Sequence, residues 1–358
     1  MNTDLKIYGL TDRFSGEATL YEGLYLARVT EQHRELYKVI SEEGEVTAAV
    51  SGKFAYGAKD AIDYPVVGDF VMIDRTNDGA GNAVIHQILR RKSVLSRQAA
   101  GTVTLPQPIA ANIDTIFICM SLNADFNLRR VERYLAVAWD SMATPVIVLT
   151  KADLCPDLAE KISELSSAAP GVDILPCSVQ SGLGLDNVEA YLAPGKTVCF
   201  IGSSGVGKST LINRLAGREV LATNEIREND DHGRHTTTHR QLILLPSGGV
   251  VIDTPGMREM QIYTGDLGKT FEDIEALASE CRYRDCTHTG EPGCRVLQAV
   301  EEGLLSPERL ASYQKLKVEL SYDGLNFRQL EEAKIKRMFG SKGEMKQMME
   351  HAKHKKGR

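Results

Sequence analysis

The sequence predicts a multidomain chain: an N-terminal β-barrel of the OB-fold type, a central three-layer α/β domain, and a C-terminal helical domain built around a Cys/His cluster. Five short β-branched runs separated by turn signals fall within residues 21–100. From about residue 114, apolar strands alternate with amphipathic helices, and three cysteines and one histidine gather between residues 281 and 294. A length of 358 residues suits several domains, because single cores stop growing beyond roughly 250 residues.

The first predicted domain is the barrel over residues 21–105, preceded by an N-terminal extension over residues 1–20. Its strands are expected at 24–29, 35–40, 47–52, 68–73 and 83–89. Five strands in so short a span are typical of a small Greek-key barrel, and we interpret this one as an OB-fold. The strand pattern alone leaves another small barrel or a sandwich open.

The second predicted domain, residues 108–266, alternates strands and helices as in a sheet covered on both faces. Strands are expected at 115–120, 145–149, 172–175, 196–201 and 250–252. Helices are expected at 128–141, 156–167 and 185–192, and another begins at Lys208. A helical domain over 267–340 and a basic tail over 341–358 complete the predicted division.

A phosphate-binding loop joins the strand at 196–201 to the helix that begins at Lys208. The loop is a full match to G-x-x-x-x-G-K-[ST], and its residues are Gly202, Ser203, Ser204, Gly205, Val206, Gly207, Lys208 and Ser209, with Thr210 following. Its backbone N–H groups can wrap a β-phosphate at the positive end of the helix. Lys208 is expected to neutralise β- and γ-phosphate oxygens during catalysis, and the Ser209 hydroxyl to ligate Mg²⁺.

Two further motifs predict that this loop belongs to a guanine-nucleotide site. Asp253-Thr254-Pro255-Gly256 follows an apolar strand, where Asp253 can hold Mg²⁺ and the Gly256 N–H can approach a γ-phosphate. Thr150-Lys151-Ala152-Asp153 is similar to the guanine-reading motif N/T-K-x-D. This second motif stands before the phosphate loop instead of after it. The order predicts a circularly permuted GTPase domain.

Asp153 is the residue that predicts selection of guanine over adenine. Its carboxylate can accept hydrogen bonds from N1–H and the 2-amino group of guanine, whereas adenine would leave the carboxylate unpaired. Lys151 is expected to lie along the base, and Ser178 falls where the last base-contacting loop of a GTPase belongs. Thr150 stands where asparagine is commoner in this motif. A hydroxyl therefore takes the place of the amide that braces the base-reading loop against a neighbouring loop.

The segment between the phosphate loop and Asp253 fits switch I. It contains His235, Thr236 and Thr237, and one threonine is expected to close over Mg²⁺ when a γ-phosphate is present. Position 257 is methionine and not the glutamine that orients water in Ras-type GTPases. We therefore expect His235 or a partner to position the attacking water, and slow turnover by the isolated protein.

Cys281, Cys286, His288 and Cys294 have the composition of a closed structural zinc site. Four protein ligands leave no open position for catalysis, so one structural Zn²⁺ that holds the helical domain together is expected. The alternative is a loop with three reduced cysteines. The remaining four cysteines are scattered, and a disulfide framework is not expected.

The net charge of −6 excludes a nucleic-acid grip over the whole molecule, but residues 328–358 carry ten Lys/Arg against four Glu. Local RNA contact is therefore predicted, and DNA is not expected as a partner. The chain has no apolar run of about 20 residues and no secretory signal at its start, which predicts a cytoplasmic protein without membrane association.

The motif order, the barrel and the Cys/His cluster together resemble the RsgA (YjeQ) family of circularly permuted GTPases. The resemblance spans residues 20–340 and is specific at Pro65-Val66-Val67-Gly68-Asp69, at residues 233–238, and around the cluster. It implies an OB-fold and a zinc domain that touch 16S rRNA, with GTP hydrolysis stimulated by the small (30S) ribosomal subunit late in its maturation. It also implies GTP and GDP as ligands and a monomeric chain.

Two other functions fit the same motifs less completely. An ATP-using P-loop enzyme would make Thr150-Lys151-Ala152-Asp153 a coincidence, and competition between GTP and ATP separates the two. A nucleotide-gated RNA-binding scaffold would bind GTP without turnover even in the presence of ribosomal subunits.

Overall fold

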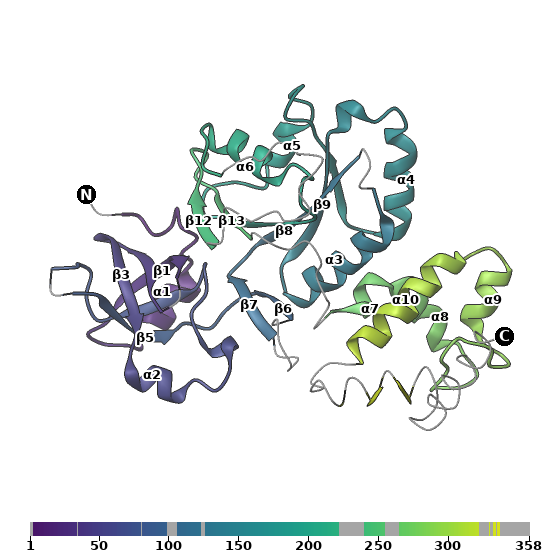
Figure 1. Cartoon of the computed structure of the whole chain (residues 1–358), viewed down its shortest axis with the longest axis horizontal. Helices are drawn as coiled ribbons and strands as arrows, with labels where there is room; N and C mark the ends of the chain where they lie inside the picture. Colours follow the sequence, from purple (N-terminus) through teal and green to yellow (C-terminus); the bar gives the residue numbers. More distant parts are fainter. Residues whose placement is uncertain are drawn as a thin grey trace, which may run out of the picture.

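The computed structural model describes residues 3–33, 35–79, 81–98, 106–122, 126–221, 240–254 and 265–321, together with 329, 332, 333, 335 and 336. Its three parts follow the order of the chain: the barrel, the α/β domain and the helical domain (Figure 1). The α/β domain lies between the other two.

The barrel is closed and has the strand connectivity expected of an OB-fold, which confirms that interpretation. Its five strands are β1 (Tyr25–Gln32), β2 (Tyr37–Ser41), β3 (Gly44–Val50), β4 (Phe70–Ile73) and β5 (Ala83–Ile88). They follow the order β1-β2-β3-β5-β4, and β4 pairs with β1 to close the barrel. The buried core includes Val29, Val39, Val46, Val71 and Ile85, which alternate with outward residues as the period of two requires.

Two short helices accompany the barrel, and the sequence patterns did not predict them. Helix α1 (Asp12–Ala18) places Phe14 against Phe70, with ring centroids 4.4 Å apart. Helix α2 (Gly52–Gly57) starts at Ser51, whose Oγ accepts a hydrogen bond from the Phe54 N–H. Helices of six or seven residues are too short to show a clear apolar period.

The α/β domain has a mostly parallel sheet. Its strands are β8 (Thr115–Ser121), β9 (Thr144–Thr150), β10 (Asp173–Pro176), β11 (Thr197–Ile201), β12 (Arg240–Leu244) and β13 (Val250–Asp253). Among the described strands the order is β10-β9-β8-β11-β13-β12, and β12 is antiparallel to its neighbour β13. Its helices are α3 (Leu128–Asp140), α4 (Leu158–Ala168), α5 (Leu185–Glu189) and α6 (Lys208–Ala216).

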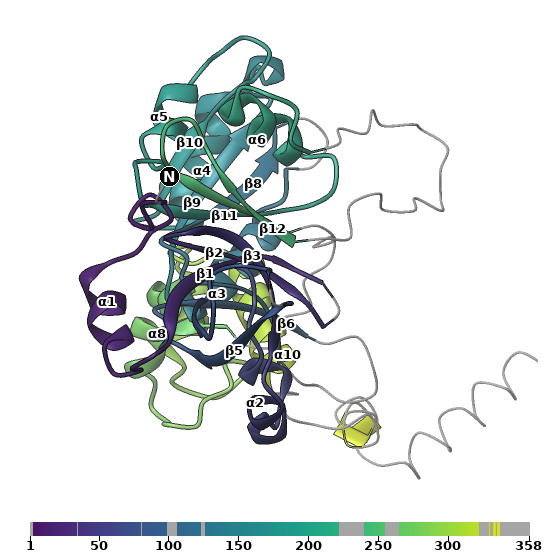
Figure 2. The ribbon, with the colours of Figure 1, turned by 90° about the vertical axis from the view of Figure 1, so that its left-hand side faces the viewer.

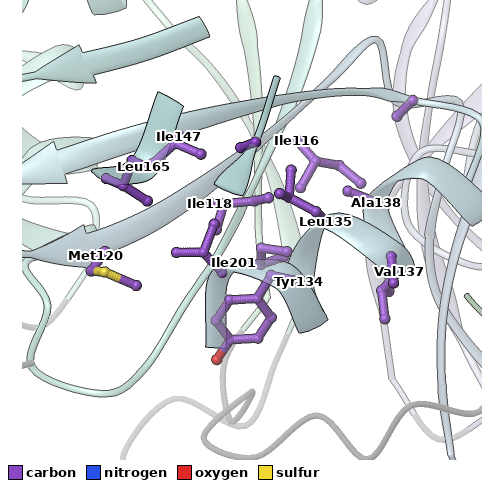
Figure 3. Packing of buried hydrophobic residues seen from close by; sticks show 14 of the residues in the cluster. Ile116, Ile118, Met120, Tyr134, Leu135, Val137, Ala138, Ile147, Leu165 and Ile201 are labelled. Carbon is purple, nitrogen blue, oxygen red and sulfur yellow. The ribbon is translucent and has the colours of Figure 1, made fainter. Parts of the chain in front are cut away.

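Alternate residues of β8 enter two different cores, which explains why this strand is apolar throughout. Ile116, Ile118 and Met120 lie on the face covered by α3, as Figure 3 shows beside Leu135. Phe117 belongs to the second core on the other face. The predicted three-layer arrangement is therefore confirmed, and the carboxyl ends of the parallel strands meet at one edge of the sheet.

The barrel and the α/β domain share one continuous sheet. Strand β1 pairs antiparallel with β12 through Glu31 opposite Gln241 and Gln32 opposite Arg240, and Figure 2 shows the barrel strands beside β12. Arg28, a fully buried residue, strengthens the junction by donating to the Thr197 hydroxyl and the Gly68 carbonyl. A short hairpin, β6 (Val94–Gln98) with β7 (Pro106–Ala111), forms a separate two-stranded sheet.

The helical domain contains α7 (Leu267–Thr270), α8 (Glu272–Ser279), α9 (Arg295–Glu301) and α10 (Pro307–Leu320). Helix α10 begins with proline at its first position, and Ser306 caps it by accepting from the Arg309 N–H. Buried Phe271 contacts Tyr313, with ring centroids 5.5 Å apart. None of the helices in the described part of the chain has the length and apolar content that crossing a bilayer requires.

Candidate nucleotide site and metal cluster

The predicted phosphate loop lies between the end of β11 and the start of α6, at the carboxyl edge of the sheet. Gly202 has φ +141°, and a Cβ there would stand 2.3 Å from the Cys119 carbonyl oxygen. Gly207 has φ +96° and precedes the first helical residue, Lys208. Position 202 therefore needs glycine for its backbone conformation and for the close approach of Cys119, and position 207 needs it for its backbone conformation.

Lys208 points back over the loop. Its Nζ donates to the Gly202 carbonyl at 2.7 Å and to the Ser203 carbonyl at 2.6 Å. These bonds place the ammonium within the turn of the loop, where the β- and γ-phosphates of a nucleotide bind in P-loop proteins. The predicted role of Lys208 therefore has a matching geometry.

The guanine-reading motif contacts the phosphate loop although it precedes the loop in the chain. Lys151 Nζ donates to the Gly205 carbonyl at 3.3 Å. The Thr150 hydroxyl lies within hydrogen-bond distance of the Val206 carbonyl and of the Met120 carbonyl. The hydroxyl of Thr150 thus makes the connection between loops that an amide makes in the commoner motif.

The base-reading side chains lie beside this connection. Asp153 is exposed within the short 3-10 helix Ala152–Leu154. The Ala152 N–H donates to the Cys177 carbonyl at 3.1 Å, which joins the motif to the loop that contains Ser178. Ser178 is buried, and its Oγ accepts from the Ser181 N–H at 3.2 Å. The structure therefore brings the two predicted base-contacting segments together.

Asp253 ends strand β13 directly beside the strand that feeds the phosphate loop, because it pairs in register with Phe200. The neighbouring Thr254 hydroxyl donates to the Phe200 carbonyl at 2.8 Å. Burial raises the pKa of Asp253, and the nearby Lys208 ammonium opposes that rise. A carboxylate here and the hydroxyl of Ser209, the second residue of α6, are oxygen donors of the type that Mg²⁺ prefers.

Some predicted residues fall outside the described part of the chain. His235, Thr236 and Thr237 lie within 222–239, and Gly256 and Met257 lie within 255–264. Thr210 is described and is an exposed residue in the first turn of α6.

The four predicted metal ligands converge in the helical domain. One ligand atom from each of Cys281, Cys286, His288 and Cys294 lies within 4.8 Å of the others. The Sγ atoms of Cys281 and Cys294 are 3.9 Å apart, and His288 Nδ1 is 3.7 Å from the first and 3.4 Å from the second. A tetrahedral zinc ion with ordinary bond lengths would need about 3.8 Å between sulfurs and about 3.5 Å between sulfur and nitrogen.

The surroundings of the cluster hold its ligands in place. Gln314 Nε2 donates to the His288 carbonyl at 2.8 Å, and the Leu297 N–H donates to Cys294 Sγ at 3.4 Å. Burial lowers the pKa of His288, which favours the neutral imidazole that a metal ligand must be. The donor set, the spacing and the outer contacts therefore fit a closed zinc site.

Arg130 is a residue near the nucleotide site that sequence reasoning missed. Its Nη1 donates to the Ser203 hydroxyl in the phosphate loop at 2.9 Å. No motif marks this residue. The only available signal was its place in the first turn of a helix that follows a central strand, since such turns lie at the carboxyl edge of the sheet.

Comparison with known proteins assigns the family. The family model described as RsgA GTPase matches residues 88–263. A relative from Lactiplantibacillus plantarum, named small ribosomal subunit biogenesis GTPase RsgA 2, is 56% identical over 97% of this chain and 98% of its own length. The crystal structure of YjeQ from Thermotoga maritima covers 83% of this chain and 99% of its own, with 28% identity and a TM-score of 0.62.

A second solved structure bears on the order of the motifs along the chain. YloQ, described as a circularly permuted GTPase, covers 84% of this chain and 96% of its own, with 25% identity and a TM-score of 0.60. The permuted order of the motifs, their assembly at one sheet edge and the near-complete coverage of a 56% identical relative agree. The chain belongs to the RsgA GTPase family and is a GTP hydrolase.

Proposed function

We propose that this GTPase hydrolyses GTP to GDP and phosphate during late maturation of the small ribosomal subunit, and that the subunit stimulates its turnover. The observation that carries the guanine-nucleotide part is the contact of Thr150 and Lys151 with the carbonyls of Val206 and Gly205. The role in ribosome maturation is supported by the relatives, which are named as GTPases of small ribosomal subunit biogenesis.

Each residue of the site has a proposed role. Loop N–H groups and Lys208 stabilise the charge that develops on the transferred phosphoryl group. Ser209 and Asp253 would hold Mg²⁺, and one of Thr236 and Thr237 would join them when a γ-phosphate is present. His235 or a ribosomal group orients the attacking water, and the Gly256 N–H senses the γ-phosphate.

Selection of guanine is assigned to the carboxylate of Asp153, with Lys151 along the base and Ser178 at its edge. The exposed position of Asp153 leaves its two oxygens accessible to N1–H and the 2-amino group of the base. Adenine lacks both donors, and we therefore propose GTP and GDP as the ligands of this site.

One structural Zn²⁺ is the proposed occupant of the Cys/His cluster. Zinc would supply bonds to three thiolates and one imidazole, and so fix the chain between α8 and α9. The spacing of 3.4 to 3.9 Å between the measured pairs of ligand atoms supports it. With four protein ligands, this metal has a structural role.

We propose the small ribosomal subunit and its 16S rRNA as partners, contacted by the barrel, the helical domain and the basic tail over 341–358. Work on ribosomal subunits implies a location in the cytoplasm. We further propose that the chain acts as a monomer and divides into an extension (1–20), barrel (21–105), GTPase (108–266), zinc domain (267–340) and tail.

The test is GTP hydrolysis by the purified protein with and without small ribosomal subunits. Wild type is compared with Lys208→Ala, and the series is repeated with ATP. We expect small subunits to stimulate hydrolysis of GTP but not of ATP, and we expect Lys208→Ala to abolish this stimulation. Intact GTP binding with equal turnover in the presence and absence of subunits would reject the ribosomal part. Equal turnover of ATP would reject the assignment of guanine.

A further inference from the structure

Helix α3 contacts the phosphate loop through Arg130 and the helical domain through Glu132 and Arg133. Figure 1 shows α3 between the central sheet and helices α7 and α10. We infer that Arg130 is a positioning residue of the phosphate loop, and that α3 makes its position depend on the docked helix α10. The inference rests on the proposed nucleotide-binding role of this loop.

The first step concerns Ser203, whose carbonyl and hydroxyl are bonded by two different cations. Lys208 Nζ bonds the Ser203 carbonyl at 2.6 Å, and Arg130 Nη1 bonds the Ser203 hydroxyl at 2.9 Å. When a nucleotide binds, Lys208 must turn toward phosphate oxygens. Arg130 then keeps the start of the loop in place, in a conformation that presents its N–H groups to the phosphates.

The second step concerns Glu132, two residues along α3. Its side chain is fully buried, and Oε1 accepts from Arg309 Nη1 of α10 at 3.0 Å while Oε2 accepts from the Ser312 hydroxyl at 2.6 Å. Arg129 Nη1 also donates to Oε1 at 2.6 Å. A buried carboxylate that loses such partners is strongly destabilised, so α3 cannot keep this position without α10.

The Arg309 side chain is held in place by several hydrogen-bond partners. Besides Glu132, it donates twice to the Asp273 carboxylate, at 2.7 Å each, and also to the carbonyls of Ala168 and Thr270. These bonds use all five N–H donors of the guanidinium. The guanidinium therefore joins α3, the end of α4, α7 and α8, and these helices have little freedom to slide past one another.

The third step concerns a half-buried ion pair between the same two helices, α3 and α10. Arg133 Nη1 and Nη2 donate to the two carboxylate oxygens of Glu319 at 2.7 and 2.8 Å. Paired bonds of this kind fix orientation as well as distance. Residues 130, 132 and 133 lie within one turn of a helix, so a shift of α10 that moves Arg133 also moves Arg130.

Helix α10 is in turn bonded to the metal cluster, since Gln314 donates to the His288 carbonyl. A continuous set of contacts thus leads from the cluster through α10 and α3 to Ser203. By linkage, docking of the helical domain and binding of nucleotide must favour each other to the same extent.

A double-mutant cycle on the full-length protein tests this inference. The variants are Arg130→Ala, Glu319→Ala and both together, and the readouts are GDP affinity with a fluorescent analogue, and KM and kcat for GTP. Arg214→Ala is the matched control, because Arg214 is an exposed arginine of the same domain at the far end of α6. Thermal unfolding of every variant identifies loss of folding.

We expect Arg130→Ala to weaken GDP binding about five-fold, by loss of one charged hydrogen bond to the loop. Glu319→Ala is expected to weaken binding about three-fold in the wild-type background and to have no further effect when Arg130 is absent. Arg130→Lys should restore part of the affinity, and Arg214→Ala should leave it unchanged.

If Glu319→Ala weakens GDP binding equally in wild type and in Arg130→Ala, the coupling does not pass through Arg130 and the inference is overturned. It is also overturned if Arg130→Ala leaves GDP affinity unchanged. These failures leave the proposed function intact, provided that wild type binds GTP and is stimulated by small subunits. Failure of the wild-type protein to bind GTP would instead reject the proposed function.

Discussion

The hydroxyl of Thr150 donates to the main-chain carbonyl of Val206, 56 positions later in the chain. The bond joins the end of β9 to the loop that follows β11. Parallel strands with their carboxyl ends at one edge bring the two motifs together irrespective of their order in the chain. Permutation therefore leaves the nucleotide site intact and changes only which segments are linked covalently.

Thr150→Ala should weaken binding of guanine nucleotides about five-fold, because removal of one hydrogen bond from a buried loop contact is worth about 1 kcal/mol. Titration with fluorescent GDP measures the effect. Thr144→Ala, at the exposed start of the same strand, is the control and should bind GDP as wild type does. Unchanged affinity of Thr150→Ala would show that the bond to Val206 does not support the site.

Gly68→Ala should destabilise the junction between the barrel and the GTPase domain. Gly68 has φ +94°, and a Cβ there would stand 2.2 Å from the Ala111 carbonyl oxygen. We expect the free energy of unfolding to fall by about 3 kcal/mol or more, since both backbone strain and a clash are involved. Urea denaturation provides the measurement.

The control for Gly68→Ala is Gly16→Ala. Gly16 lies within helix α1, and a Cβ there meets nothing within 4 Å. Because alanine favours a helix over glycine by about 1 kcal/mol, this variant should be as stable as wild type or slightly more stable. Similar urea midpoints for Gly68→Ala and wild type would contradict the geometry of the junction.

Removal of zinc should unfold the chain between α8 and α9, where the four ligands converge. One zinc per chain is expected by elemental analysis, and Cys294→Ser should lose it together with helical signal in far-UV circular dichroism. Cys155→Ser is the control, because Cys155 lies outside the cluster. If purified protein without zinc shows the same helical content and protease resistance as protein with zinc, the structural role is wrong.

The regular elements were predictable where local patterns are strong. Strand β8 is apolar at all of its positions because both faces are covered, and the expected strand at 115–120 agrees with Thr115–Ser121. The helix expected at 128–141 agrees with Leu128–Asp140, since an amphipathic period over more than three turns is distinctive. The convergence of the four metal ligands was also predictable, from their spacing.

Other features depend on contacts that no local pattern records. The pairing of β1 with β12 joins two domains through backbone bonds, which place few demands on side-chain type. The contact of Arg130 with Ser203 depends on the three-dimensional position of α3 and not on a motif. Helix α1 is held by the contact of Phe14 with Phe70 and by the Glu17 carboxylate, which accepts from the Arg90 N–H, and its seven residues show no period.

The proposed site predicts that residues 150–153 read the base of a nucleotide that residues 202–209 hold. The most direct measurement is the competition of GTP, ATP and XTP for wild type and Asp153→Asn. Wild type should prefer GTP over ATP by at least about a hundred-fold, because the carboxylate would stay unpaired against adenine. The asparagine amide donates to the 2-oxo group of xanthine, so the variant should prefer XTP over GTP. Retention of the GTP preference by Asp153→Asn would contradict the claim.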